Sequence, residues 1–220
     1  MPVADTPSNR LSARVRAETR PDHEAAQGSG YLDALAAGRL PLAAYADLAG
    51  QHFVVYDTLE RAGREMVGDP VAGDFVRPEL DRVPALAADL GFLVGPDWPD
   101  RIAPVPATVA YRERLRAVAF DRAPAFLAHH YTRYLGDLSG GQFLGPAIAR
   151  SYRLNRDGHR FFAFKGIRPP AFRAAYRDML DRISWRRADE DAFVAEVSEA
   201  YRLNIAMLGE LTERWDGGRA

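Results

Sequence analysis

A cluster of glycines inside a long helical segment constrains this chain more than any other feature of its sequence. The apolar periodicity from about residue 123 to 152 predicts a helix, yet Gly136, Gly140 and Gly141 lie within it. Each glycine costs a helix interior about 1 kcal/mol relative to alanine. The cluster therefore indicates that the helix bends here, or that a flat body lies directly on its backbone.

Two of these glycines mark one face of the predicted helix. Gly136 and Gly140 are four residues apart, so both point to the same side, and Asp137 places a carboxylate beside that bare backbone. Close packing against a second helix is the alternative explanation, because Gly-x-x-x-Gly spacing also lets two helices approach. An isolated pair of glycines favours helix packing, but the residues that surround this pair favour a bound ligand.

The stretch from residue 131 to 142 reads Tyr-Thr-Arg-Tyr-Leu-Gly-Asp-Leu-Ser-Gly-Gly-Gln. It resembles the distal-helix signature of the haem oxygenases over twelve contiguous positions, and the order of segments is similar from about residue 11 to 211. In that family the glycines let the helix kink and lie against the haem face, and the aspartate holds a network of water molecules above it. The resemblance implies the same roles for these glycines and for Asp137.

An iron ligand for haem has to be sought among the histidines, because the chain has no cysteine. The five histidines are His23, His52, His129, His130 and His159. His129 and His130 precede the glycine-rich stretch on the same helix, so they cannot also reach the opposite face of a haem. We interpret them as packing or hydrogen-bonding residues, His52 as an ordinary residue of an amphipathic helix, and His159 as a loop residue.

His23 remains as the candidate ligand. Its segment, Thr-Arg-Pro-Asp-His-Glu-Ala-Ala-Gln, resembles the proximal segment of the same family, in which a histidine near the amino terminus is the axial ligand of the iron. A ligating imidazole needs an acceptor for its second N–H. The family often has a glutamate four residues after the ligand, and here that position is Gln27, which carries no charge. This departure leaves the basicity of His23 open.

Haem carries two propionates, and their negative charges need cationic side chains as partners. Arg16 lies two helical turns before His23, and Arg173 and Arg177 share one face of a later helix. The resemblance implies that these three arginines and Tyr131 hold the propionates and orient the ring for opening at its α meso carbon. A solvated surface is the alternative, because most arginine pairs at this spacing are exposed.

The resemblance places three further residues near the water network: Tyr56, Arg133 and Asn204. For Tyr56 and Asn204, packing in the core is an equally good explanation. The implied reaction uses haem b as substrate and prosthetic group, with O2 and reducing equivalents, and yields biliverdin, carbon monoxide and ferrous iron. No Gly-x-Gly-x-x-Gly sequence follows a strand, so we expect electrons from a ferredoxin or a flavoprotein reductase that docks on an arginine-bearing rim.

Other functions are compatible with parts of this pattern. A haem carrier or sensor would keep His23 and the arginines but would need no acid at Asp137. Thiaminase-like and di-iron proteins share a helical scaffold of this kind. A thiaminase needs a cysteine nucleophile, however, and a di-iron site needs facing Glu-x-x-His sets, and the sequence contains neither.

Residues 1–220 are expected to form a single all-α domain, in which haem is sandwiched between a proximal helix and a kinked distal helix. Flexible tails are expected at about 1–10 and 214–220. A net charge of −1 at pH 7 predicts no attraction to nucleic acid or anionic membranes. The lack of a long apolar run, a leader and a carboxy-terminal anchor predicts a cytoplasmic protein.

Glycine and proline predict the helix boundaries. The expected helices span about 8–27 with an interruption at Pro21, then 31–37, 41–67, 78–93, 107–120, 123–152, 170–183 and 188–213, with an irregular connector at 94–106. Thr19 and Asp22 are expected to act as an N-cap and a capping-box acid that restart the first helix after Pro21.

Overall fold

The computed structural model describes residues 10–28 and 30–216, without the side chain of residue 216, and all regular structure in these residues is helical. The first part contains α1 (Leu11–Glu18), α2 (Arg20–Gln27), α3 (Gly30–Ala36), α4 (Leu42–Met66), η2 (Ala72–Phe75), η3 (Pro78–Leu80), α5 (Val83–Leu93) and α6 (Trp98–Arg101). The second part contains α7 (Pro106–Val118), α8 (Ala123–His130), η4 (Tyr131–Leu135), α9 (Gly136–Ser151), η5 (Arg160–Phe162), α10 (Pro169–Asp181) and α11 (Arg187–Asp216). The prediction of a single-domain all-α fold is confirmed.

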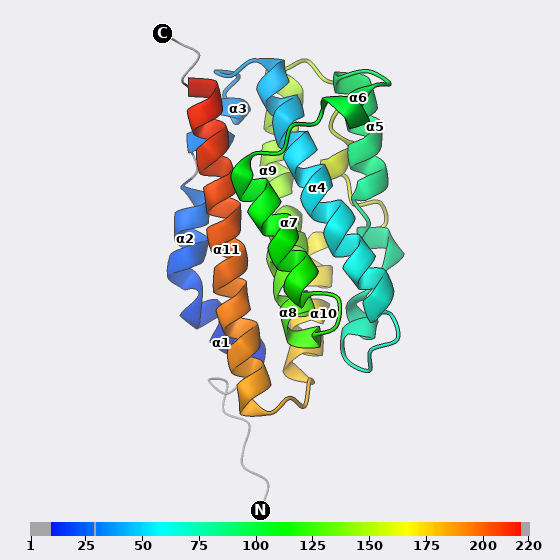
Figure 1. Cartoon of the computed structure of the whole chain (residues 1–220), viewed down its shortest axis with the longest axis vertical. Coiled ribbons are helices and arrows are strands. Elements are labelled where there is room, and N and C mark those ends of the chain that lie inside the picture. Colours follow the sequence, from blue (N-terminus) through cyan, green and yellow to red (C-terminus); the bar gives the residue numbers. More distant parts are fainter. Residues whose placement is uncertain (1–9, 29, 217–220) are drawn as a thin grey trace, which may run out of the picture.

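The longer helices lie side by side along the long axis of the molecule (Figure 1). α11 packs along α8 and α7, α4 packs against α5 and α7, and α2 lies against α11 at one edge. Their shared core is built from leucine, valine and alanine together with large rings. Tyr56, Tyr111 and Tyr176 are among the fully buried side chains. Buried hydroxyls need hydrogen-bond partners, so these tyrosines mark where polar groups enter the core.

The first helical segment is interrupted at Thr19, next to Pro21, as predicted. The predicted cap by Thr19 and Asp22 is wrong, because the Thr19 hydroxyl donates to the carbonyl of Val15, 2.7 Å away, and makes no cap to α2. A buried threonine can satisfy its hydroxyl on the preceding turn of its own helix. The predicted start of this segment, at residue 8, lies outside the described residues.

Three other boundaries differ from the predicted ones. The helix predicted over 78–93 is two elements, η3 and α5, because Pro84 fits the first turn of a helix and not its interior. The predicted connector at 94–106 contains the short helix α6. Helix α11 continues past the tail boundary predicted at residue 214. Arg214 and Trp215 both donate to the carboxylate of Asp47, at 3.0 and 2.9 Å, and so hold this end of the helix against α4.

The glycine-rich helix is irregular just before its glycines. α8, η4 and α9 follow one another without a break, and η4 is a turn of π-helix. Such a turn joins residues five apart instead of four, and it occurs frequently at functional sites. The predicted irregularity is therefore present, but it lies immediately before Gly136 and not at the glycines themselves. We refer to η4 and α9 together as the distal helix.

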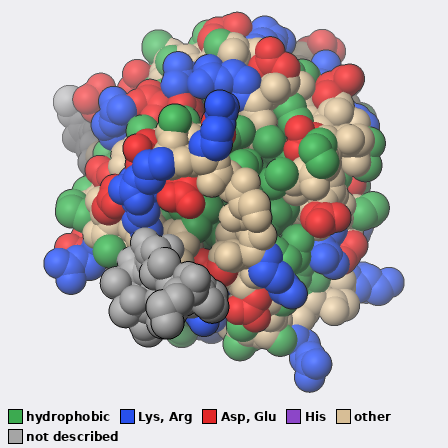
Figure 2. Space-filling view, turned by 90° about the horizontal axis from the view of Figure 1, so that it is seen from below, with side chains coloured by type: hydrophobic (Ala, Val, Ile, Leu, Met, Phe, Trp, Pro, Cys, Tyr) green, Lys and Arg blue, Asp and Glu red, His purple; other side chains and the backbone are tan. Residues whose placement is uncertain are grey.

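One end of the molecule brings charges of both signs together. Figure 2 shows the end at which α11 begins, with arginine side chains interspersed among acidic ones. Arg14 of α1 pairs with Glu18 at 2.7 Å and with Glu190 of α11 at 3.4 Å, and it also contacts Asp191. These ion pairs fasten α1 to α11. Within the described ranges, no helix is long and apolar enough to cross a membrane.

Candidate functional site

Four glycines of the distal helix face two different environments. A Cβ atom added to Gly136 or Gly140 meets no atom within 4 Å, and both residues are exposed. At Gly141 and Gly145, an added Cβ lies 3.3 and 2.7 Å from the side chain of Phe162. Close packing therefore explains the second pair. The first pair leaves an open strip of backbone, against which a flat ligand fits.

Alanine on the two faces is expected to have opposite effects on stability. Gly140→Ala should stabilise the ligand-free protein by up to about 1 kcal/mol, because alanine favours the helix and its methyl group meets nothing. Gly145→Ala should destabilise it by about 1–3 kcal/mol, because the ring of Phe162 has to move. Urea denaturation of the ligand-free proteins measures both changes. Equal losses of stability in the two variants would contradict this assignment of faces.

Asp137 stands beside the open strip and is held by a core tyrosine of α4. The hydroxyl of Tyr56 donates to the Asp137 carboxylate, and the guanidinium of Arg133 lies 5.0 Å from the centre of the Tyr56 ring. Arg133 Nη1 donates to the side-chain oxygen of Asn204 on α11, 2.6 Å away. The buried Nε and Nη2 atoms of Arg133 have no hydrogen-bond partner among the described residues. The cluster joins α4, the distal helix and α11, and it leaves two buried donors that water can satisfy.

Burial and the neighbouring groups act in opposite directions on the pKa of Asp137. Burial raises the pKa of Asp137, and the positive charge of Arg133 and the hydrogen bond from Tyr56 act against that rise. Burial also raises the pKa of Tyr56 well above its ordinary value, and the charge of Asp137 adds to this effect. Tyr56 is therefore protonated at neutral pH and donates to Asp137. A carboxylate with a raised pKa takes up a proton more readily than one in water, which suits a group that passes protons.

His23 stands on α2, where this helix packs against α11. Its ring lies edge-on to the ring of Tyr201 of α11, with the centroids 5.9 Å apart, and its side chain is exposed. Burial raises the pKa of Tyr201, and so do the nearby Tyr131 and Asp22. Tyr201 therefore lies between the segment that carries His23 and the distal helix. In the part of the chain that the structure describes, no hydrogen bond joins His23 to Gln27.

Three of the residues predicted to hold propionates converge from different helices. Burial raises the pKa of Tyr131, whereas the positive charges of Arg177 on α10 and Arg16 on α1 lower it, so both guanidinium groups lie near its hydroxyl. Both arginines are exposed. Arg173 is engaged with the distal helix, because its Nη1 donates to the hydroxyl of Ser139, 2.5 Å away. Arg16 and Arg177 thus lie near Tyr131, whereas Arg173 is hydrogen-bonded to the distal helix.

A polar residue that was not predicted from the sequence, His52, lies beside the Asp137 cluster. His52 lies one turn before Tyr56 and packs against Phe161, with the ring centroids 5.1 Å apart. Phe161 is itself held in place because its backbone N–H donates to the buried carboxylate of Asp89, at 2.8 Å. Burial lowers the pKa of His52 well below its ordinary value, and the charge of Arg133 lowers it further. The four-residue spacing from Tyr56 is the one signal in the sequence that points to this histidine.

His129 and His130 are internal hydrogen-bonding residues, as predicted. His129 Nε2 lies 3.0 Å from the carboxylate of Glu196, and His130 Nδ1 lies 2.9 Å from the hydroxyl of Tyr176. Both imidazoles are buried, and burial lowers the pKa of each. They are therefore neutral parts of the core at neutral pH.

The buried imidazole of His130 is expected to make the fold sensitive to acid. Burial lowers its pKa to about 3, against an ordinary value of 6.5. As the pH falls, the unfolded state takes up this proton first, so the contribution to stability is complete above pH 6.5 and is lost towards pH 3. Between pH 6.5 and about pH 5 this loss should be about 2 kcal/mol. His130→Gln should abolish it, as measured by urea denaturation at both pH values; parallel losses in the two proteins would contradict the prediction.

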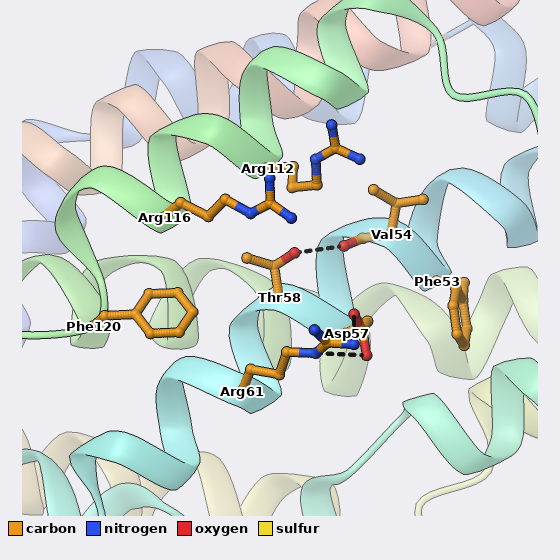
Figure 3. Close-up of a pocket in the computed structure, with 8 residues that line it drawn as sticks. All are labelled: Phe53, Val54, Asp57, Thr58, Arg61, Arg112, Arg116 and Phe120. Carbon is orange, nitrogen blue, oxygen red and sulfur yellow. Dashed lines mark hydrogen bonds and ion pairs between the residues drawn. The ribbon is translucent and has the colours of Figure 1, made fainter.

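A separate groove runs between α4 and α7 (Figure 3). It has a volume of about 530 Å³ and is lined by Phe53, Val54, Asp57, Thr58, Arg61, Arg112, Arg116 and Phe120. All three of its arginines are paired with acids: Arg61 with Asp57 and Arg116 with Glu113, both at 3.0 Å, and Arg112 with Glu113 at 3.1 Å. Tyr56 lies on the same helix but is buried in the core. The groove is therefore distinct from the candidate site.

The structure is a helical protein with an exposed histidine on α2 and a bare helix face beside an acid on the distal helix. The family model described as heme oxygenase matches residues 9–210. This chain belongs to the haem oxygenase family.

Individual relatives agree with this assignment over nearly the whole chain. The protein named "Heme oxygenase 1" from Nostoc sp. is 32% identical over 206 residues, which cover 93% of this chain and 87% of that protein. The crystal structure of heme oxygenase-1 from Synechocystis sp. PCC6803 in complex with heme has a TM-score of 0.88 at 30% identity and covers 95% of both chains. The structure of heme oxygenase from Leptospira interrogans has a TM-score of 0.85 at 31% identity, covering 91% of this chain and 99% of that one.

Proposed function

We propose that this chain binds haem b between α2 and the distal helix, with His23 as the iron ligand. It degrades haem oxidatively to biliverdin, carbon monoxide and ferrous iron, using O2 and electrons from an external donor. One observation carries the proposal. The bare strip at Gly136 and Gly140 lies directly beside Asp137, which accepts a hydrogen bond from Tyr56. A flat ring on this strip would have the acid cluster at its face.

The residues of this chain fit haem on both sides. The imidazole of His23 is exposed and has a ring contact on one side only in the described chain, so a nitrogen is accessible to a metal. On the other side, Gly136 and Gly140 carry no side chains that would keep the ring away from the helix. Haem itself supplies the iron at which O2 is reduced and the porphyrin edge that is oxidised. The protein supplies position, protons and exclusion of competing groups.

Asp137 is the proposed proton-handling residue. Its carboxylate accepts from Tyr56, and the two unpartnered nitrogens of Arg133 can donate to water molecules next to it. Water held between an acceptor and such donors forms a hydrogen-bonded path for protons. The bond from Arg133 to Asn204 fixes the guanidinium, so that these donors keep their direction. His52 adds a neutral imidazole to the same side.

Arg16, Tyr131 and Arg177 are the proposed propionate-binding residues, because the charges of both arginines, on two different helices, act on the Tyr131 hydroxyl. Arg173 can join them if its guanidinium exchanges the Ser139 hydroxyl for a carboxylate, which makes the stronger hydrogen bonds. Guanidinium groups at these positions orient the ring, and we propose opening at the α meso carbon. The electron donor is a ferredoxin or a flavoprotein reductase, which docks where these arginines reach the surface.

Titration with hemin followed by reduction tests this function. Purified protein should bind hemin in a 1:1 complex. When a reductant is supplied in air with catalase present, the Soret band should disappear while the absorption of biliverdin grows. A haem spectrum that persists through repeated supply of electrons from several donors would indicate a carrier or sensor instead. Failure to bind hemin would overturn both functions.

A further inference from the structure

Helix α10 carries two of the proposed anion-binding arginines but is anchored by few side chains. Tyr176 and Leu180 are its buried residues. Tyr176 lies between Arg173 and Arg177 in the sequence, and its ring packs edge-on against Phe75, with the centroids 4.9 Å apart. An anchor at Tyr176 therefore sets the position of both arginines, one helical turn apart.

The hydroxyl of Tyr176 is held by His130. The Tyr176 hydroxyl lies 2.9 Å from Nδ1 of His130, and the two rings stack with an interplanar angle of 17°. Both side chains are buried, at 2% and 3% exposure, so water does not compete for this bond. His130 is followed directly by Tyr131, the first residue of η4, whose ring centroid is 6.2 Å from that of Tyr176. The bond thus joins the arginine-bearing helix to the start of the distal helix.

The far end of α10 is fastened to the helix that carries Arg16. The carboxylate of Asp181 accepts from the backbone N–H of Ser12, at 2.8 Å, and from its hydroxyl, at 2.9 Å. Asp181 thereby satisfies, from another helix, one of the free N–H groups at the start of α1. With α10 held at Tyr176 and at Asp181, Arg177 lies between two fixed points of its helix.

We propose that His130 and Tyr176 form a positioning pair, which places Arg173 and Arg177 for recognition of the two carboxylates of the substrate. The proposal rests on the proposed function, in which these arginines meet the propionates. The pair does not touch the substrate; it acts through α10. Without it, α10 keeps Leu180 and the Asp181 contact but can rotate or shift its arginines away from Tyr131.

The test compares two tyrosine-to-phenylalanine variants. Tyr176→Phe removes the hydroxyl that meets His130 and keeps the ring. Tyr31→Phe is the matched control, because Tyr31 is equally buried and its hydroxyl donates to the carbonyl of Ala44 at 2.8 Å, away from the arginines. For each protein the dissociation constants of hemin and of hemin dimethyl ester are measured, together with the melting temperature of the haem-free form. The ester keeps the ring and iron but removes the carboxylate charges.

Wild type should prefer hemin to its ester. In Tyr176→Phe this preference should fall roughly three- to tenfold, as expected for one lost neutral hydrogen bond, and biliverdin should be produced as more than one isomer. Tyr31→Phe should melt at a similarly reduced temperature but keep the wild-type preference and a single isomer. If Tyr176→Phe does not fold, His130→Leu, which removes the nitrogen that meets the Tyr176 hydroxyl, takes its place.

Two failures can be told apart. If wild type binds hemin and its ester equally, the assignment of propionate contacts in the proposed function is overturned, and the positioning role with it. If wild type discriminates but Tyr176→Phe keeps the same preference as Tyr31→Phe, only the positioning role is overturned.

Discussion

Asp137→Ala is expected to bind hemin but to form biliverdin about 10²–10⁴ times more slowly than wild type, which is the usual range for loss of a proton-handling group. The substitution leaves the hydroxyl of Tyr56 without its acceptor and removes the negative charge beside Arg133. Under the proposed function, the water network would then lose its anchor. Single-turnover absorption spectra with a chemical reductant and catalase measure the rate separately from the supply of electrons by a partner.

Two companion variants sharpen this result. Asp57→Ala removes an acid one residue after Tyr56. This carboxylate pairs with Arg61 in the groove between α4 and α7 (Figure 3), so activity should be unchanged. Asp137→Asn keeps an oxygen that accepts from Tyr56 and should retain more activity than Asp137→Ala. Equal, wild-type rates in Asp137→Ala and Asp57→Ala would remove Asp137 from the mechanism.

His23→Ala is expected to abolish turnover and to weaken hemin binding by at least about tenfold, because the iron would lose its proposed protein ligand. The lost side chain is exposed and has a ring contact with Tyr201, so its removal opens a space that solvent can enter. Added imidazole should occupy this space, restore the spectrum of a histidine-ligated haem and recover part of the activity. Absorption spectra with and without imidazole provide the measurement.

His159→Ala is the matched control for this substitution. His159 lies next to η5, which packs against α5 and α9, and its replacement should leave the haem spectrum as it is in wild type. A histidine-ligated spectrum in His23→Ala without added imidazole would show that another residue ligates the iron. The buried His129 and His130 would have to leave their partners Glu196 and Tyr176 to do so.

The distinction between an oxygenase and a haem carrier depends on the face of the ring opposite His23. A carrier needs the ligand and the cations, which the exposed His23 and the convergent Arg16 and Arg177 would provide. It has no use for a carboxylate whose pKa is raised by burial beside donors that lack partners. Burying such a group costs folding free energy. Its presence next to the open strip is therefore best explained by proton transfer during turnover.

Local features of the sequence were sufficient to predict the helical fold. Amphipathic periodicity and the glycine and proline signals act over a few residues, so most helix boundaries fall close to their predicted positions. The glycines around Asp137 were informative for the same reason, because the cost of glycine in a helix is a local quantity. The predicted cap at Thr19 failed because of a local bond to Val15, whereas other failed predictions involve partners distant in the chain. For example, α11 is longer than predicted because Asp47 binds Arg214, 167 residues away.

The sequence by itself determined the all-α fold, the bare helix face and the acid beside it, since each follows from the conformational preferences of neighbouring residues. Only the tertiary structure decided how these parts act together. It showed that Phe162 covers Gly145 and leaves Gly140 open. It also brought Tyr56 to Asp137 across 81 residues and Asn204 to Arg133 across 71. Hydrogen bonds of such long range depend on how the helices pack, which no local pattern encodes.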